Sequence, residues 1–322
     1  MGMRVLVTGG AGFIGSHLAE ALLERGDEVL CIDNLDSYYD PSIKRRNLAA
    51  LLPRPGFTFI EGDIRDRDLL DQIGKSNPLD VVVHLAARAG VRPSIREPGL
   101  YAEVNLLGTS HLLEIARQYS IRRFIFASSS SVYGERTETP FRESDRVDHP
   151  ISPYAATKRG GELLCHTYHH LFGLDVACLR FFTVYGPRQR PEMAIHKFAR
   201  LIDEGRPVPL YGDGSARRDF TYISDIVGGI LCAIEHNQGY AIYNLGNHRM
   251  IALKELITRL AEALAVEPQI EKLPAQPGDV SVTCADIDLA RRELGYHPST
   301  SIDEGLASFV AWFRESRAGG AS

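Results

Sequence analysis

The sequence Thr-Gly-Gly-Ala-Gly-Phe-Ile-Gly at residues 8–15 is the feature that most limits how this chain can fold. It joins a valine-rich apolar run at residues 3–8, typical of a strand buried on both faces, to a helical pattern at residues 16–25. Its glycines have two spacings found in phosphate-binding turns: Gly10, Gly12 and Gly15, and Gly9, Gly12 and Gly15. Only glycine lets the backbone approach a pyrophosphate closely enough for free N–H groups at a helix N-terminus to bind it. The turn therefore predicts a dinucleotide-binding strand–turn–helix unit.

An acidic residue follows at the distance that such a unit requires. A second strand-like run, at residues 28–33, ends at Asp33, which lies 18 residues after Gly15. A carboxylate at this position accepts hydrogen bonds from the adenosine ribose hydroxyls, and it repels a 2′-phosphate. The alternative is a tight turn followed by a solvated aspartate. The order of strand, turn, helix and second strand favours dinucleotide binding, with NAD preferred over NADP.

Short β-branched runs alternate with helical patterns through the first half of the chain. Strands are expected at residues 57–60, 81–85, 123–127 and 176–182, and helices at 67–74, 105–119 and 154–172. This alternation predicts right-handed βαβ units and an α/β fold with a doubly wound parallel (Rossmann) sheet.

Prolines interrupt the pattern after Gly186. We predict a dinucleotide-binding domain at residues 1–186 and a smaller C-terminal α/β domain, mainly for substrate, at 187–322. The strand-like run at residues 241–246 suggests that about 216–248 rejoins the large sheet. Amphipathic helices are expected at 253–264 and 302–313.

A serine, a tyrosine and a lysine form the candidate catalytic group. Tyr154 and Lys158 are four residues apart, so they share one face of a helix. A neighbouring ammonium group and a nicotinamide cation would both lower the pKa of the tyrosine toward a useful range for a base. Four serines, 128–131, follow the strand predicted at 123–127 and so fall at the carboxyl edge of the sheet, where ligands bind. Ser129 can then hold the oxygen of a substrate alcohol or ketone while Tyr154 moves its proton.

Composition excludes several other classes of protein. The 322 residues carry 36 Lys and Arg against 41 Asp and Glu, a net charge of −5, with no basic block, so a nucleic-acid partner is not expected. No apolar run approaches the roughly 18 residues of a membrane span, and no signal peptide is evident. The five cysteines are scattered, as in a cytoplasmic protein. His166, His169 and His170 have a metal-compatible spacing but no evident acidic or thiolate partner, so no metal site is predicted.

Several motifs together resemble those of extended short-chain dehydrogenases/reductases, and specifically of nucleotide-sugar epimerases. Besides residues 8–15, they are Gly62-Asp63-Ile64, His84-Leu85-Ala86-Ala87, Asn105-x-x-Gly108, Ser-Ser-Ser-Ser-Val-Tyr-Gly at 128–134, Tyr154-x-x-x-Lys158, Arg-Phe-Phe-Thr-Val-Tyr-Gly-Pro at 180–187 and Arg218-Asp219-Phe220. The resemblance covers essentially the whole chain. It implies a homodimer formed by paired helices.

The resemblance also implies a set of cofactor contacts. Asp63 and Ile64 would flank the adenine, Leu85, Ala86 and Ala87 would line the dinucleotide path, and Asn105 would support the site from its helix. The cofactor-binding residues that we predict are Gly9, Gly12, Phe13, Ile14, Gly15, Asp33, Asn34, Ser37, Asp63, Ile64, Leu85, Ala86, Ala87, Asn105, Tyr154 and Lys158.

The serines at 130 and 131 bear on the reaction. Similar dehydratases have an Asp-Glu pair at these positions, and similar decarboxylases have a glutamate at the second of them, for proton chemistry on a 4-keto sugar. This chain offers only hydroxyl groups there. The resemblance therefore implies epimerisation at C4, by oxidation and then reduction from the opposite face. A dehydratase or decarboxylase is disfavoured, and the intact Ser129, Tyr154 and Lys158 argue against a non-catalytic dinucleotide sensor.

Three stretches, 34–40, 148–150 and 188–194, resemble the UDP-glucuronate 4-epimerase branch more than the UDP-glucose branch, which remains the alternative. A uronate carboxylate needs polar partners. The substrate-binding residues that we predict are Ser129, Ser130, Ser131, Tyr154, Thr183, Arg190, Arg218 and Asp279. Arg190 is assigned to the carboxylate, although it could be a solvated or phosphate-binding arginine, and Arg218 to the pyrophosphate, with Arg92 as a weaker candidate. Related UDP-glucose epimerases usually have an arginine where this chain has Gln276.

Overall fold

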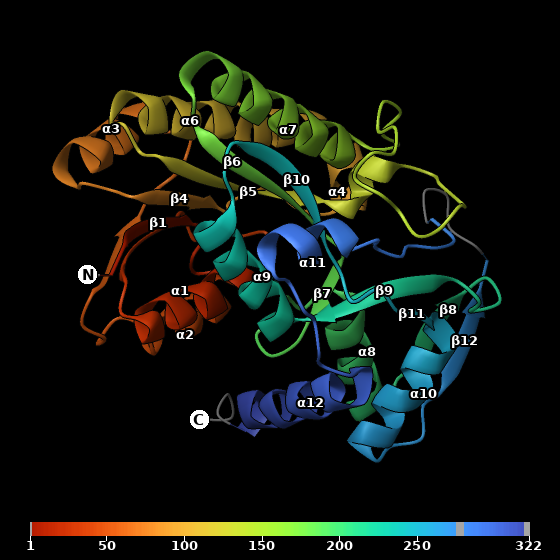
Figure 1. Cartoon of the computed structure of the whole chain (residues 1–322). Coiled ribbons are helices and arrows are strands. Elements are labelled where there is room, and N and C mark those ends of the chain that lie inside the picture. Colours follow the sequence, from red (N-terminus) through yellow and green to blue (C-terminus); the bar gives the residue numbers. More distant parts are fainter. Residues whose placement is uncertain (1, 275–279, 319–322) are drawn as a thin grey trace.

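The computed structural model describes residues 2–274 and 280–318. Seven parallel strands form the central sheet in the order β10-β6-β5-β4-β1-β2-β3 (Figure 1). These strands are β1 (Arg4–Thr8), β2 (Glu28–Asp33), β3 (Phe57–Glu61), β4 (Val81–His84), β5 (Arg123–Ser129), β6 (Asp175–Phe181) and β10 (Tyr240–Leu245). The strand order reverses between β1 and β4, so a crevice opens at their carboxyl ends, where such sheets bind ligands. The predicted Rossmann-like parallel sheet is confirmed.

Helices cover both faces of this sheet (Figure 1). One face packs against α1 (Phe13–Arg25), α9 (Ile223–His236) and α11 (Asp288–Leu294), and the other against α3 (Arg67–Ser76), α6 (Gly108–Gln118) and α7 (Pro153–Phe172). In β1 the apolar side chains alternate between the two cores: Val5 and Val7 face the first group of helices and Leu6 the second. A continuous apolar run is the expected sequence of a strand buried on both faces.

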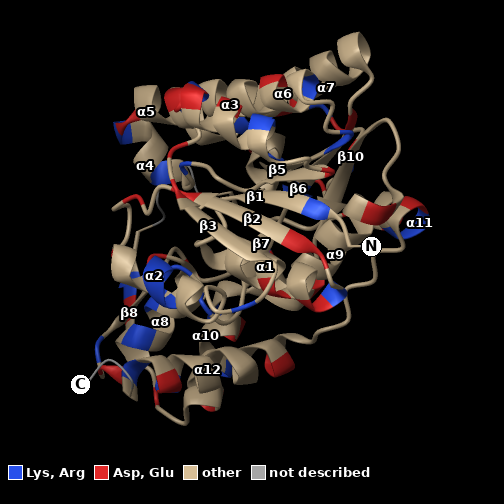
Figure 2. Ribbon diagram, turned by 90° about the vertical axis from the view of Figure 1, so that its left-hand side faces the viewer, with Lys and Arg blue, Asp and Glu red and all other residues tan. Residues whose placement is uncertain are grey.

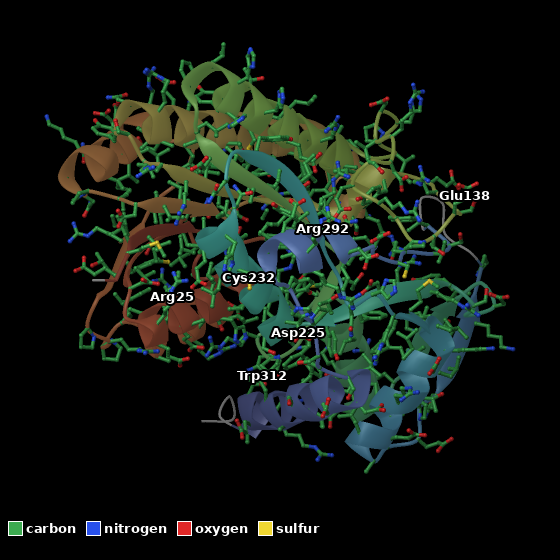
Figure 3. All side chains as sticks on the ribbon, viewed as in Figure 1. Arg25, Glu138, Asp225, Cys232, Arg292 and Trp312 are labelled. Carbon is green, nitrogen blue, oxygen red and sulfur yellow. The ribbon has the colours of Figure 1, made fainter. Side chains whose placement is uncertain are left out.

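A smaller group of elements lies beside the sheet, around a separate apolar core (Figure 1). It contains the helices α8 (Ala194–Asp203), α10 (Leu253–Leu264) and α12 (Ile302–Ala318). A three-stranded sheet is formed by β7 (Thr183–Tyr185), β9 (Arg217–Tyr222) and β11 (Met250–Ala252), and a two-stranded sheet by β8 (Val208–Tyr211) and β12 (Ile270–Leu273). Asp225 in the first turn of α9 accepts hydrogen bonds from the N–H groups of Ser299 and Thr300, and so fastens the segment that leads into α12, where Trp312 is labelled in Figure 3.

Some element boundaries differ from those expected. Strand β5 continues through Ser128 and Ser129, so only the last two of the four serines follow the strand. Helix α1 begins at Phe13, three residues before its predicted start. A π-helical stretch, Glu103–Leu107, precedes α6 where one uninterrupted helix was expected. Helices α2 (Pro41–Ala49), α8, α9 and α11 were not predicted from the sequence.

Charged residues of both signs are distributed over the helices of both parts of the molecule (Figure 2). None of the helices in the described residues is long and apolar enough to cross a membrane.

Candidate active site

The turn between β1 and α1 forms a tight cradle at the carboxyl edge of the sheet. Gly9 has φ +70°, and a Cβ there would lie 2.8 Å from the backbone nitrogen of Ala86. A Cβ on Gly15 would lie 2.3 Å from the carbonyl oxygen of Gly9. Gly12 is the N-cap of α1, so the N–H groups of the first helical turn have no intrahelical acceptor. This cradle has the positive helix end and the close backbone that a pyrophosphate requires.

A cavity of about 380 Å³ extends from the cradle. Of the predicted cofactor residues, the cavity is lined by Gly9, Gly12, Phe13, Ile14, Gly15, Asp33, Asn34, Asp63, Ile64, Leu85, Ala86, Ala87, Tyr154 and Lys158. Ser37 and Asn105 are not among its lining residues. The glycine cradle, the acid at the end of β2 and the length of this lining fit an adenine dinucleotide.

Asp33 is buried at the end of β2 and is held by three donors. Its carboxylate accepts hydrogen bonds from the N–H groups of Ala11 (3.2 Å) and Leu35 (2.9 Å) and from Nζ of Lys44 (3.0 Å). Lys44 was not among the predicted site residues, because α2 was not predicted from the sequence. The available signal was Asp40-Pro41, since Asp40 accepts the N–H of Ser42 as a helix cap and proline suits the first helical position.

Asn34 and Asp63 lie together in the lining of the cavity. Asn34 Nδ2 donates a hydrogen bond to Asp63 Oδ2 at 2.9 Å. A hydrogen bond from Arg65 is the largest of the influences that lower the pKa of Asp63 to about 2. Asp63 therefore remains ionised at neutral pH.

Asn105 lies behind the cavity wall and connects it to the helix of Tyr154. Its Oδ1 accepts the N–H of Arg88 at 2.8 Å, while Nδ2 donates to the Arg88 carbonyl and to Thr157 Oγ1, both at 3.0 Å. Thr157 in turn donates to the carbonyl of Tyr154. Asn105 thus supports the site without lining the cavity.

The predicted catalytic residues meet at one end of the cavity. Ser129 is the last residue of β5, and Tyr154 and Lys158 lie one turn apart near the start of α7. Ser152 caps this helix by accepting the N–H of Ala155 at 3.1 Å, and Pro153 occupies the first helical position. The cap fixes where α7 begins, and so where Tyr154 faces the cavity.

Burial changes the pKa values of Tyr154 and Lys158. Burial raises the pKa of Tyr154, while a hydrogen bond with Ser129 and the charge of Arg190 act in the opposite direction. Burial also lowers the pKa of Lys158 to about 8, and its Nζ donates to the carbonyl of Ala127 at 2.7 Å. Burial outweighs the hydrogen bond from Ser129 and the charge of Arg190, so the net pKa of Tyr154 is raised.

Hydroxyl groups and one arginine surround the space next to Tyr154. Ser130, Ser131, Thr183 and Arg190 all line the same cavity. Ser131 donates its N–H to Ser129 Oγ at 3.1 Å and accepts the Ser129 hydroxyl at 3.2 Å. Positions 130, 131 and 183 therefore offer hydroxyl groups to this cavity rather than acidic side chains.

Two further cavity residues beside Arg190 were missed by the sequence analysis. The ring of Tyr38 lies 5.1 Å from the guanidinium carbon of Arg88 and 5.9 Å from that of Arg190. The ring comes from the segment after β2, and Arg190 from the segment before α8. Their contact brings the two parts of the molecule together over the cavity.

Arg218 lines a second cavity, of about 600 Å³, together with Arg92, Lys197 and Tyr211. Thr183 lines both cavities, so they adjoin at this residue. Arg218 is therefore placed away from the catalytic residues, at the far side of Thr183. The predicted substrate residue Asp279, like Gln276, lies outside the described residues.

The histidines at the far end of α7 have ordinary structural contacts. His169 Nδ1 donates to the carbonyl of Leu174 at 2.9 Å, and the ring of His166 packs edge-on against Tyr240. Among the residues that the structure covers, no three His, Cys, Asp or Glu side chains gather in a group that could hold a metal ion.

The parallel sheet, the glycine cradle and the cavity that joins it to Tyr154 define a dinucleotide-binding α/β protein with a second ligand site. The model of the NAD dependent epimerase/dehydratase family matches residues 5–246. The chain belongs to this family.

Individual relatives are similar over nearly the whole chain. UDP-glucuronate 4-epimerase 3 of Arabidopsis thaliana is 45% identical over 97% of this chain and 76% of its own length. A crystal structure of UDP-glucuronic acid 4-epimerase from Bacillus cereus, in complex with UDP-glucuronic acid and NAD, is 37% identical with a TM-score of 0.92, covering 98% of this chain and 100% of the other. UDP-glucose 4-epimerase from Thermotoga maritima with UDP-glucose is 34% identical with a TM-score of 0.91, covering 98% and 100%.

Proposed function

We propose that this chain is a UDP-glucuronate 4-epimerase, which interconverts UDP-glucuronate and UDP-galacturonate with tightly bound NAD. The observation that carries the proposal is the lining of the cavity beside Tyr154. Ser130, Ser131, Thr183 and Arg190 line this cavity, so positions 130 and 131 supply hydroxyl groups and no acidic side chain. The 45% identity to a relative of this name supports the same substrate.

The two cavities would bind different parts of the cofactor and substrate. Residues 1–186 would hold NAD, and 187–322 would mainly hold the UDP-sugar. Arg218, with Arg92 as a second candidate, would bind the pyrophosphate in the second cavity, where a planar guanidinium suits phosphate oxygens. The sugar would pass beside Thr183 to reach Tyr154, since Thr183 borders both spaces.

Tyr154 is the proposed acid and base. Its phenolate takes the proton of the C4 hydroxyl during oxidation and returns it during reduction, while Ser129 holds the C4 oxygen. When bound, NAD accepts the C4 hydride and gives it back to the other face of the sugar. Because burial raises the pKa of Tyr154, its ionisation requires positive charge in the loaded cavity. Lys158 donates a hydrogen bond to the carbonyl of Ala127 and lines the same cavity as Tyr154.

The hydroxyl groups also bear on the fate of the intermediate. A 4-keto uronate is a β-keto acid, which loses CO₂ when its carboxylate turns out of the plane of the ketone. Ser130, Ser131 and Thr183 would hold the carboxylate in that plane, and Arg190 would balance its charge. Epimerisation rather than decarboxylation is the expected outcome.

We also propose a cytoplasmic homodimer. Its five cysteines are free. Helices α6 and α7 lie side by side on the outside of the sheet (Figure 1). Leu107, which directly precedes α6, and Leu163 of α7 are exposed. Apolar side chains exposed together on such a pair of helices would suit a two-fold contact. Sedimentation or light scattering at micromolar concentration measures the mass and tests this part of the proposal.

The decisive experiment incubates the purified protein with UDP-glucuronate, UDP-glucose or UDP-xylose and separates the products by chromatography. UDP-galacturonate from UDP-glucuronate is the expected product. Conversion of UDP-glucose without conversion of UDP-glucuronate would replace this proposal with the UDP-glucose/UDP-galactose alternative. A UDP-pentose as the main product would point to a decarboxylase, and a dehydrated UDP-sugar would point to a dehydratase.

A further inference from the structure

The segment that carries Arg190 into the cavity has an unusual backbone. Gly186 has φ +143° and Arg188 has φ +63°, in the left-handed region that residues with a side chain rarely adopt. Such conformations persist only where surrounding contacts hold them, and they cluster at functional sites. Contacts with the rest of the fold must therefore hold this segment in place.

One set of contacts ties this segment to helix α1. His17 Nε2 donates to the carbonyl of Pro187 at 2.9 Å, and Arg188 Nη2 lies 2.7 Å from Oε1 of Glu20. His17 and Glu20 are three residues apart, so both project from one face of the helix. The first turn of the same helix forms the pyrophosphate cradle.

A second set of contacts is buried. The side chain of Gln189 is 1% exposed, and its Nε2 donates to the carbonyl of Val184 at 3.1 Å. Its Oε1 accepts the N–H of His196 at 3.2 Å, and its own carbonyl accepts His196 Nδ1 at 2.6 Å. Gln189 thus fixes the backbone on both sides: toward β7, and toward the start of α8.

Arg190 follows directly, and its side chain is already oriented. Its Nε lies 3.1 Å from Oε1 of Glu192, and its guanidinium packs over the ring of Tyr38. A flexible arginine loses much side-chain entropy when it binds an anion. An arginine that is held in place before binding avoids part of that loss, and so gives a larger net affinity.

We propose that Gln189 and the Arg188–Glu20 pair are positioning residues that preset Arg190 as a receptor for the sugar carboxylate. The proposal rests on the proposed function, since it takes the ligand to be a uronate. Selectivity for an acidic over a neutral UDP-sugar then depends on side chains that touch neither ligand. The selectivity also depends on the position of α1, because this helix contacts the Arg190 segment and carries the cofactor cradle at its first turn.

The test measures binding rather than turnover. NAD-loaded Tyr154→Phe protein is titrated with UDP-glucuronate and with UDP-glucose, and the ratio of the two Kd values gives the selectivity. Gln189→Met keeps the size of the side chain but removes the amide, and Glu20→Gln removes the charge that holds Arg188. Glu235→Gln is the matched control, because Glu235 also pairs with α1, through Arg25 at 3.0 Å, but at the end remote from the cradle (Figure 3).

We expect Gln189→Met to reduce the selectivity about fivefold or more, and Glu20→Gln to reduce it about two- to threefold, through weaker UDP-glucuronate binding. The control should leave the ratio unchanged, and NAD content and melting temperature report folding. Equal weakening of both sugars, or an unchanged ratio in both variants, would overturn the proposal. If Gln189→Met does not fold, the result for Glu20→Gln decides, since that pair is partly exposed. Failure of the proposed function is distinct, since there the wild-type protein would not interconvert UDP-glucuronate and UDP-galacturonate.

Discussion

Replacing Glu162 with glutamine tests whether one buried ion pair holds helix α7 against the sheet. Glu162 lies two turns after Tyr154 and is fully buried. Its carboxylate accepts hydrogen bonds from Ser128 Oγ (2.6 Å), from Arg180 Nε and Nη2 (2.8 and 2.9 Å) and from Arg159 Nη1 (3.0 Å). Arg180 comes from β6, so these contacts join the catalytic helix to the strand next to β5.

The size of the effect follows from what the substitution leaves behind. Glutamine keeps the shape of the side chain, so no cavity forms, but its NH₂ group faces donors where an oxygen accepted. The Arg180 side chain is 1% exposed and its charge would have no counter-ion. Breaking a buried ion pair on one side costs about 3–5 kcal/mol, and we expect about 3 kcal/mol for Glu162→Gln. The double variant Glu162→Leu with Arg180→Met should lose less than the single variant, because no fully buried charge stays unpaired and Arg159, which also loses Glu162, is partly exposed.

Urea unfolding at pH 7.5 measures this loss as a lower midpoint at an unchanged slope. Glu235→Gln, which removes an exposed ion pair, should lose no more than about 1 kcal/mol. A loss below about 1 kcal/mol for Glu162→Gln, or a double variant as unstable as the single one, would refute the reasoning.

The same pair predicts a pH dependence. Burial alone would raise the pKa of Glu162, but hydrogen bonds and charge from Arg180 reverse the effect, and the net pKa is lowered. A carboxyl group with a lowered pKa stabilises the fold fully above its unfolded pKa and loses this effect as the pH falls through its folded pKa. The difference in stability between the wild type and Glu162→Gln should therefore shrink below about pH 4.3.

Three further substitutions test the site itself. Tyr154→Phe should lower kcat by about 10²–10⁴-fold, while NAD released on denaturation, measured by chromatography, stays at the wild-type amount; retained turnover would disprove its role as acid and base. Arg190→Gln removes a charge that lowers the pKa of Tyr154, so the acidic limb of the pH profile of kcat/KM should move to higher pH, and Arg190→Lys should leave it near the wild-type position. Ser131→Glu should divert part of the product to a decarboxylated sugar, and an unchanged product ratio would show that the hydroxyl at this position does not decide the reaction.

The sequence was sufficient to predict the features that are local or periodic. The glycine turn, the acid at the end of β2 and the tyrosine–lysine spacing each depend on a few neighbouring residues. Their meeting at one sheet edge follows from the parallel topology. The prediction failed at α2, because its sequence has a weak apolar face and its position depends on packing of buried residues such as Leu48. Lys44 was therefore absent from the predicted site, whereas Tyr38 lies in the stretch 34–40 that was singled out by resemblance but was given no role in the site.

The pKa of Tyr154 shows a different limit. Sequence spacing identifies Lys158 as a neighbour, and a neighbouring cation alone would lower the tyrosine pKa. The spacing does not show how deeply both groups are buried, nor that the ammonium group donates to the carbonyl of Ala127. Desolvation depends on everything packed around a group. Whether its effect on the tyrosine pKa is larger than that of the nearby charges could therefore be determined only from the fold.

The raised pKa of Tyr154 makes its ionisation depend on the charges that are bound near it. Net charge is −5, yet the proposed ligands are strongly anionic, so under the proposed function local donors would hold them: the first turn of α1, Arg218 and Arg190. Burial raises the pKa of Tyr154, and the charge of Arg190 offsets only part of this effect. A substrate carboxylate on Arg190 would cancel part of the charge that favours the phenolate. Under the proposed function, the positive charge of the oxidised cofactor would then favour ionisation of Tyr154, so the C4 proton would leave most readily when a hydride acceptor is in place.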